Sequence, residues 1–312
     1  MITRSLKVVP KPVFTAFLRQ YTVSPEQKKF YADNGYLSIK ELIEATSLDK
    51  YKQRFVQICK GLVDRGNITI VKEPPLVAAG VKGEDAVNKL QDILFDDVFS
   101  QYFEDPRLLH VVSQLIPGDT KKIEDVNLMG MHTMFINKPP GTTPHPPHQD
   151  LYYFPFRPAH KIVAAWTAVD HVTQENGCLY VVPGSHKLEK IYAHANSKDE
   201  GKALYHGVLE EESVAPMDKR VHFVMSPGDT IFFHPLLVHG SGPNVTKTHR
   251  KSISCHYANG ECYYIDVSDS AQAQIAEEIV AAVSKKFGFS DITVQEIFKY
   301  RSKQVKGTKS NL

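Results

Sequence analysis

The sequence has 312 residues, of which 42% are hydrophobic and 23% are charged, as in an ordinary folded globular protein. Its formal net charge of only +2 argues against a dedicated nucleic-acid-binding protein. No run of about 18 apolar residues is present, so no membrane span is predicted. The four cysteines lack C-x-x-C spacing and are interpreted as reduced thiols.

Residues 1–23 are basic: they contain Arg4, Lys7, Lys11 and Arg19 and no acidic residue. We interpret this segment as either a targeting presequence or a basic arm that lies over the domain. A capping box follows, formed by Ser24 and Gln27 with Pro25 in the first turn, and it predicts a helix that ends at Gly35.

The stretch 24–118 is predicted to be mainly helical. Apolar residues recur at helical spacing from Asp49 towards a stop near Gly66. A further helix is predicted around Glu84–Phe95, and another from Asp105-Pro106 to Pro117-Gly118.

Short strands are predicted from about Val126, and the resulting β core covers 126–258. A polar stretch, Lys187–Lys219, interrupts this core, and long insertions of this kind often form a lid over a site. Helices are predicted to return over 268–305, so 24–312 is interpreted as a single domain. The predicted strands are Val126–Asn137, Lys161–Val172, Cys178–Val182, Val221–Met225, Thr230–Phe233 and Ser252–Ala258.

The motif that carries chemistry is His148-Gln149-Asp150. In an extended chain, residues two apart share a face, so the imidazole and the carboxylate would point into one cavity. With His239 they form the two-histidine, one-carboxylate set that binds non-haem Fe(II). Arg250 follows on the next predicted strand, and its planar guanidinium is suited to hold a carboxylate. This ordered pattern is typical of Fe(II)/2-oxoglutarate oxygenases.

The nearby histidines His145 and His234 are predicted to face away from the metal cavity, in structural or supporting roles. Four site residues at the strand ends of one cavity favour a double-stranded β-helix. The predicted fold is therefore a mainly β, jelly-roll, cupin-like core. Helices from the first third of the chain and from its carboxyl-terminal part flank this core.

Several long strings of residues resemble the phytanoyl-CoA dioxygenase family of Fe(II)/2-oxoglutarate oxygenases. The resemblance runs from Ser24 almost to Leu312 and is poorest over 1–23, over Gly141–Pro144 and across 187–219. The matching strings include His148-Gln149-Asp150-Leu151-Tyr152-Tyr153-Phe154-Pro155, Ala165-Trp166-Thr167-Ala168, Pro183-Gly184-Ser185-His186, Phe232-Phe233-His234-Pro235-Leu236-Leu237, His239-Gly240-Ser241-Gly242 and Arg250-Lys251-Ser252-Ile253-Ser254-Cys255-His256.

The resemblance implies an activity and a set of site residues. The activity is 2-hydroxylation of a branched-chain acyl-CoA in peroxisomal fatty-acid alpha-oxidation. It uses Fe(II), 2-oxoglutarate and O2, with ascorbate as reductant. The implied iron ligands are His148, Asp150 and His239, and 2-oxoglutarate would lie beside them. The residues implied to contact 2-oxoglutarate are Arg250, Ser241 and Trp166, with Lys89 and Met134 as further members of its pocket.

The resemblance also implies acyl-CoA as the partner and residence in the peroxisome, while the cytosol and the mitochondrion stay open. The chain ends in Ser310-Asn311-Leu312, which is similar to the Ser-Lys-Leu address that a peroxisomal import receptor recognises. Two alternative functions remain. One is a hydroxylase of the same superfamily that acts on another small molecule, and the other is a catalytically idle β-barrel that only binds.

Overall fold

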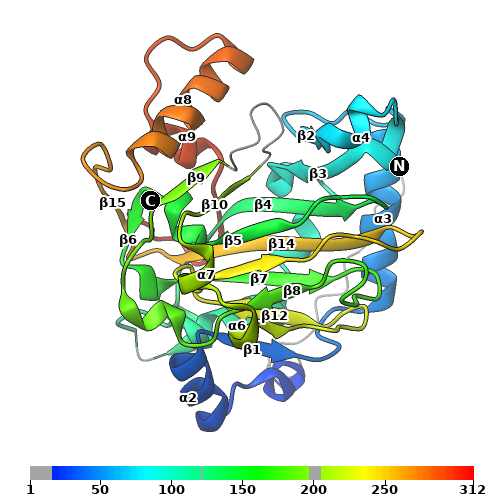
Figure 1. Cartoon of the computed structure of the whole chain (residues 1–312). Helices are drawn as coiled ribbons and strands as arrows, with labels where there is room; N and C mark the ends of the chain where they lie inside the picture. Colours follow the sequence, from blue (N-terminus) through cyan, green and yellow to red (C-terminus); the bar gives the residue numbers. More distant parts are fainter. Residues whose placement is uncertain (1–15, 121, 197–204) are drawn as a thin grey trace, which may run out of the picture.

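Two antiparallel β-sheets form the centre of the computed structural model, which describes residues 16–120, 122–196 and 205–312 (Figure 1). The larger sheet has eight strands. They are, in spatial order, β1 (Tyr36–Ile39), β12 (Thr230–Phe233), β7 (Ile162–Ala168), β14 (Arg250–Asn259), β4 (Leu128–Lys138), β3 (Val87–Gln91) and β2 (Thr69–Lys72), with β16 (Lys303–Lys306) paired to the start of β4.

The smaller sheet has four strands and carries two of the predicted metal ligands. It consists of β11 (Val221–His222), β8 (Leu179–Val181), β13 (His239–Ser241) and β5 (His145–His148). Two further pairs are β9 (His194–Asn196) with β10 (His206–Val208), and β6 (Phe156–Arg157) with β15 (Tyr263–Tyr264). This sheet-rich core with flanking helices confirms the predicted jelly-roll class.

The helices lie on the periphery of this core (Figure 1). No helix in the described part of the chain is long and apolar enough to span a membrane. The helices are α2 (Pro25–Asn34), α3 (Ala45–Cys59), α4 (Pro74–Ala78), α5 (Ser100–Phe103), α6 (Pro106–Leu115), α7 (Glu211–Val214), α8 (Ala273–Phe287) and α9 (Val294–Tyr300).

Local capping signals placed several helix ends correctly. The Gln27 amide N–H donates to Ser24 Oγ and the Ser24 N–H donates to Gln27 Oε1, so the predicted capping box of α2 is present. Gly35 ends that helix at φ 81°, where a left-handed backbone favours glycine. Asp105 caps α6 through the Arg107 N–H, as its place before Pro106 predicted.

The helix predicted around Glu84–Phe95 is wrong, and the first third of the chain is less helical than expected. Val87–Gln91 is strand β3, which pairs with β2 on one side and β4 on the other. Its polar residue Asn88 is buried and donates to the Glu73 carboxylate at 2.7 Å. Pairing with two strands therefore overrides the local pattern.

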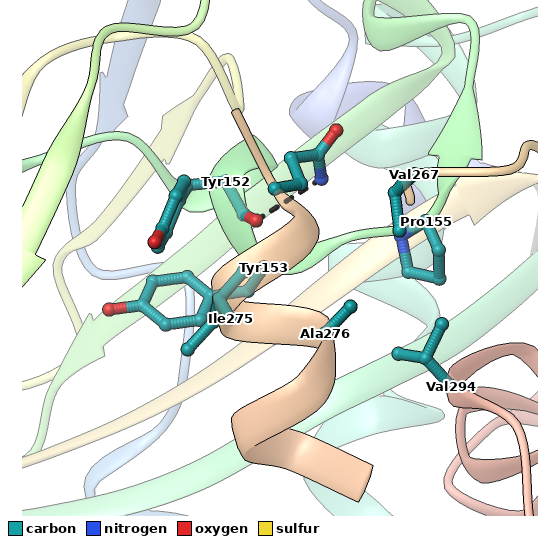
Figure 2. A pocket seen from close by; sticks show the side chains of 8 residues that line it. Tyr152, Tyr153, Pro155, Val267, Ile275, Ala276 and Val294 are labelled. Atoms are coloured by element: carbon teal, nitrogen blue, oxygen red, sulfur yellow. Dashed lines mark hydrogen bonds between the residues drawn. The ribbon is translucent and has the colours of Figure 1, made fainter. Parts of the chain in front are cut away.

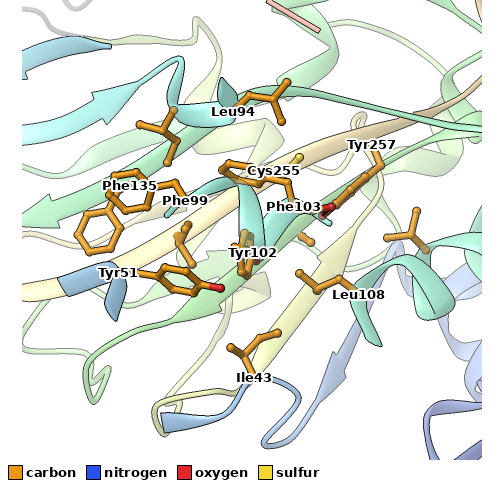
Figure 3. Packing of buried hydrophobic residues seen from close by; sticks show 14 of the residues in the cluster. Ile43, Tyr51, Leu94, Phe99, Tyr102, Phe103, Leu108, Phe135, Cys255 and Tyr257 are labelled. Atoms are coloured by element: carbon orange, nitrogen blue, oxygen red, sulfur yellow. Dashed lines mark hydrogen bonds between the residues drawn. The ribbon is translucent and has the colours of Figure 1, made fainter. Parts of the chain in front are cut away.

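Two hydrophobic cores lie on opposite faces of the larger sheet. On the outer face, α3, α5 and α6 pack against it, and Tyr51, Tyr102 and Phe135 lie together there (Figure 3). Phe55 of α3 stacks on Phe135 of β4 at 4.9 Å between ring centroids. On the inner face, Trp166 and Phe233 of the larger sheet share a cluster with Val181 of β8 in the smaller sheet. This second core joins the larger sheet to the smaller one.

The segments outside this core are described in part. In the insertion Lys187–Lys219, the described residues include the β9–β10 pair and α7, while 197–204 lie outside the described residues. Residues 1–15 of the basic arm also lie outside them. The arm's last residues are held by α6, because Gln114 accepts from the Val23 N–H and donates to the Tyr21 carbonyl. The division into an arm over 1–23 and one domain over 24–312 stays a prediction.

Candidate metal centre and anion pocket

His148, Asp150 and His239 converge between the two sheets. His148 ends β5 and His239 begins β13, and the two residues are direct partners in the strand pairing. Asp150 starts the short 3-10 helix that follows β5, η5 (Asp150–Tyr153). Its Oδ1 lies 3.5 Å from His148 Nε2, and its Oδ2 lies 3.7 Å from His239 Nε2. One ligand atom from each residue lies within 4.8 Å of the others, a spacing that suits a single metal ion.

Backbone carbonyls set the orientation of both imidazoles. His148 Nδ1 lies 3.0 Å from the Pro146 carbonyl oxygen, and His239 Nδ1 lies 3.0 Å from that of Leu237. A carbonyl only accepts, so each Nδ1 carries the proton and each Nε2 presents its lone pair towards Asp150. Burial lowers the pKa of His239 to about 4, which keeps this ring neutral and able to bind a metal.

Asp150 stays ionised although it is buried. Burial alone would raise its pKa, but His239 and His256 together hold the pKa of this carboxyl well below its usual value. A third histidine contacts this carboxylate, because His256 Nε2 donates to Asp150 Oδ2 at 2.7 Å. The centre accordingly presents two imidazole nitrogens and one anionic oxygen, which is a set that fits a divalent transition metal.

The turn that carries Asp150 is fixed from α8. Gln272, at the amino-terminal end of α8, donates through Nε2 to the carbonyls of Leu151, Tyr152 and Phe154. Around this contact Tyr152 and Tyr153 lie against Ile275 and Ala276 of α8, and a small hollow remains between the turn and the helix (Figure 2). The metal carboxylate thus sits on a turn that the carboxyl-terminal helices support.

Arg250 lies in the same interior, as its predicted role requires. Its side chain is buried, Nη1 donates to Ser252 Oγ, and Nη2 donates to the Gly177 carbonyl, both at 2.9 Å. Its Nε has no hydrogen-bond partner, and the guanidinium lies 5.4 Å from the Trp166 ring centroid. Burial lowers the pKa of Arg250 to about 10, so the group is still a cation near neutral pH.

A second buried cation, Lys138, was missed from the sequence. It is the direct cross-strand partner of Arg250, and its Nζ donates to Ser241 Oγ at 3.1 Å. Burial, and then the charge of Arg250, lower the pKa of Lys138 to about 7. Among the described residues neither cation forms an ion pair. Two buried cations side by side without a carboxylate are unfavourable unless an anion joins them, so Arg250, Lys138 and Ser241 define an anion pocket.

The strand register places the remaining predicted residues on this inner face. Trp166 pairs with Ser254, Met134 pairs with Ser254 from the other side, and Lys89 pairs with Ile136 on β4. Lys89 was expected on a helix, but it lies on β3, and its Nζ is 5.1 Å from the Tyr205 ring centroid. Met134 Sδ faces the Gln91 side-chain amide. Lys89 and Met134 therefore line the interior, and among the described residues they contact the Tyr205 ring and the Gln91 amide rather than the anion pocket.

His145 lies closer to the centre than its spacing suggested. The β5–β13 pairing shifts register between His239 and Ser241, so the usual alternation fails there. The His145 ring stacks on His148 at 4.1 Å, and Tyr205 from the insertion stacks on His145 at 3.9 Å. By contrast, His234 lies against His186 and accepts from the Leu236 N–H, in the structural role predicted for it.

The fold and this site together define a jelly-roll protein with the metal-ligand set of non-haem iron oxygenases. The family model described as Phytanoyl-CoA dioxygenase (PhyH) matches residues 31–252. The chain is 44% identical over 306 residues to "Probable phytanoyl-CoA dioxygenase" of Caenorhabditis elegans, covering 93% of this chain and 95% of that protein. It therefore belongs to the phytanoyl-CoA dioxygenase family and is an enzyme of the dioxygenase class.

Other relatives agree with this assignment. "Phytanoyl-CoA dioxygenase, peroxisomal" of Bos taurus is 41% identical over 305 residues, which cover 94% of this chain and 87% of the bovine protein. Among solved structures, EctD from S. alaskensis with 2-oxoglutarate and 5-hydroxyectoine aligns with a TM-score of 0.58 at 21% identity. That alignment covers 76% of each chain. At this identity the likeness shows the shared fold alone.

We predict that His148→Ala, Asp150→Ala and His239→Ala each abolish tight binding of a divalent metal while the fold survives. A site with three protein ligands has no spare ligand, so the loss of one leaves too few. Equilibrium titration with Mn(II), followed by circular dichroism of each variant, measures both properties. His145→Ala is the matched control, because it removes a stacked histidine of the same strand that contributes no ligand to the triad. Tight Mn(II) binding in all three triad variants would contradict the assignment.

Proposed function

We propose that the protein is an Fe(II)- and 2-oxoglutarate-dependent hydroxylase that acts at C2 of a branched-chain acyl-CoA such as phytanoyl-CoA. The observation that carries the proposal is that a three-ligand centre and a buried anion pocket share strand β13, which carries both His239 and Ser241. The triad His148, Asp150 and His239 suits iron, and Arg250 with Lys138 suits the distal carboxylate of 2-oxoglutarate. The acyl-CoA part rests on the names of the relatives.

The residues present fit iron, because the donor set is complete and both Nε2 atoms are free. When bound, Fe(II) with 2-oxoglutarate and O2 supplies the oxidation that replaces a C–H hydrogen of the substrate by hydroxyl, and releases succinate and CO2. The chain's own residues bind and orient. Arg250 and Ser241 hold the distal carboxylate, Trp166 covers the guanidinium, and the packed strands exclude water from the cavity.

The carboxylate of Asp150 favours hydroxylation over halogenation. In halogenases of a similar fold, a small residue replaces the carboxylate so that a halide can take its place on the metal. Here Asp150 is present, ionised and held by His256, so that coordination position belongs to the protein. The proposal therefore concerns oxygen insertion.

The decisive experiment is an assay of succinate release with iron, 2-oxoglutarate and ascorbate over a panel of substrates. The panel contains straight and 3-methyl-branched acyl-CoAs, the matching free acids, and no substrate. We expect the greatest stimulation with branched acyl-CoA, together with a 2-hydroxyacyl-CoA product. Turnover with another small molecule but no acyl-CoA would favour a different hydroxylase of the superfamily. Binding of iron and 2-oxoglutarate without any decarboxylation would favour an idle binding protein.

We further propose that the protein resides in peroxisomes, since relatives from four mammals carry "peroxisomal" in their names. The candidate address is Ser310-Asn311-Leu312. In the structure the Asn311 N–H donates to the Gly260 carbonyl and Leu312 packs against a hydrophobic cluster, so an import receptor would have to release this tail. Deletion of 310–312 should leave a tagged protein in the cytosol. Continued import would reject this address, and a mitochondrial location of the intact protein would favour the basic arm.

One prediction from the proposed function concerns Arg250. Arg250→Lys keeps the charge but loses the planar fork of donors, so we expect a raised KM for 2-oxoglutarate with a smaller effect on acyl-CoA. The loss should be on the order of 1.5–3 kcal/mol, the usual size for a hydrogen bond to a charged group. Arg250→Ala should lose more. Steady-state kinetics in each substrate separately test this. An unchanged KM for 2-oxoglutarate with a collapse of acyl-CoA binding would instead make Arg250 a phosphate contact of CoA.

Another prediction is that the affinity for 2-oxoglutarate depends on pH through Lys138. Burial lowers the pKa of this lysine to about 7. The carboxylate of 2-oxoglutarate favours the charged amine, so binding takes up a proton once the free lysine is neutral. Affinity should therefore be constant below about pH 7 and fall above it, by at most about tenfold per pH unit for one proton.

The measurement is calorimetric titration of 2-oxoglutarate into Mn(II)-loaded protein between about pH 6 and about pH 9. Lys138→Met should bind weakly at low pH and lose this pH dependence. Lys251→Met is the matched control, since Lys251 is next to Arg250 on β14 but lies over the Phe55 ring on the outer face. A wild-type pH profile in Lys138→Met would reject the role of this lysine.

A further inference from the structure

His256 holds the metal carboxylate from behind. It lies on β14, is buried, and its Nε2 is 2.7 Å from Asp150 Oδ2, the oxygen that also faces His239. Asp150 can only accept, so His256 Nε2 carries the proton. This hydrogen bond to one oxygen holds the carboxylate in one rotamer, and therefore in one orientation towards the metal.

His132 lies behind His256, on β4. The two Nδ1 atoms are 3.4 Å apart, and the two rings lie 5.1 Å apart between centroids. Burial lowers the pKa of His132 well below its usual value, so this ring is neutral. The Phe154 ring packs edge-on against both imidazoles. His132, His256 and Asp150 thus form a row that ends at the metal centre.

The backbone at His132 is strained in order to build this row. Its φ is 46°, in the left-handed region that residues other than glycine rarely adopt. The β4–β14 pairing shifts register at the same place: Ser254 faces Met134, but His256 faces Met131. The extra residue in β4 is a bulge, and bulges beside active sites re-aim side chains. Strain of this kind persists where function requires the geometry.

We propose that His256 is the positioning residue of the metal centre, and that the strained bulge at His132 exists to hold the His256 ring against Asp150. Neither residue contributes a ligand atom to the triad. Their effect reaches the metal through the orientation of the Asp150 carboxylate. The proposal rests on the metal centre of the proposed function.

The test is the affinity for Mn(II), measured without turnover from the fraction of free Mn(II) in its electron paramagnetic resonance signal. His256→Leu removes the donor to Asp150, and we expect about ten- to a hundredfold weaker binding. His256→Gln should restore most of the affinity, because its amide nitrogen reaches nearly the position of Nε2. His186→Gln is the control: it removes another buried histidine, whose Nε2 lies near the Ala32 carbonyl oxygen.

The outcomes distinguish a failure of the proposed metal centre from a failure of the positioning role of His256. If wild-type protein fails to bind Mn(II), the proposed function falls with the metal centre. If the wild type binds tightly and His256→Leu binds as tightly, the metal centre stands and the positioning role is wrong. If His256→Gln loses as much as His256→Leu, the donor to Asp150 is not what matters, and the proposal is also overturned.

A second pair of variants isolates the strain. His132→Ala removes the ring and keeps a side chain in the left-handed conformation, whereas His132→Gly removes the ring and relieves the backbone. We expect both to weaken Mn(II) binding similarly, while metal-free His132→Gly melts at a higher temperature than His132→Ala. Wild-type affinity in His132→Gly would show that the ring does not support His256.

Discussion

The cost of burying charge governs the interior of this protein. A buried ion must find a partner, and the interior between the sheets contains one charge that has a partner and two charges that lack one. Asp150 is held by His256 and lies beside two metal-binding imidazoles. Arg250 and Lys138 have only neutral partners: a backbone carbonyl and two serine hydroxyls. The interior therefore presents a candidate metal site and an anion site, the two features that a chelating diacid needs at once.

Strand β14 connects these two sites. It pairs with β4 and β7 along most of its length, and its inward residues run from Arg250 through Ser252 and Ser254 to His256. The anion clamp and the support of the metal carboxylate therefore share one central strand, which packs on its outer face against helices. A site built on a rigid strand holds its geometry more precisely than one built on loops. The bulge opposite His256 adjusts the register at only one point.

Local signals predicted much of the fold. Capping residues predicted the starts of α2 and α6. The H-x-D spacing predicted that His148 and Asp150 lie close together, as they do, although Asp150 lies on η5 and not on the strand itself. Features that depend on contacts between residues far apart in the sequence were not predicted. The pairing of β3 with two strands is non-local, so a segment with a buried asparagine looked helical. Lys138 resembled an ordinary strand-end lysine because only its pairing with Arg250 shows that it is buried without an acid. His145 was misplaced because a register shift cannot be seen in the spacing of residues.

The arrangement of the two sheets accounts for the candidate metal and anion sites, but it does not account for the choice of substrate. Proteins with this fold whose names mention nogalamycin or 5-hydroxyectoine align with TM-scores of 0.56 and 0.58, although only about a fifth of their residues are identical. A fold shared so widely does not select a ligand, and function resides in the groups placed around the site. In this chain the insertion supplies such a group: Tyr205 stacks on His145, which stacks on the metal ligand His148, and the Tyr205 hydroxyl donates to Asn88 of β3. Tyr205 therefore joins the insertion to the smaller sheet and to the larger sheet beside the candidate metal centre, so it is the insertion, and not the strands alone, that completes the surroundings of His148.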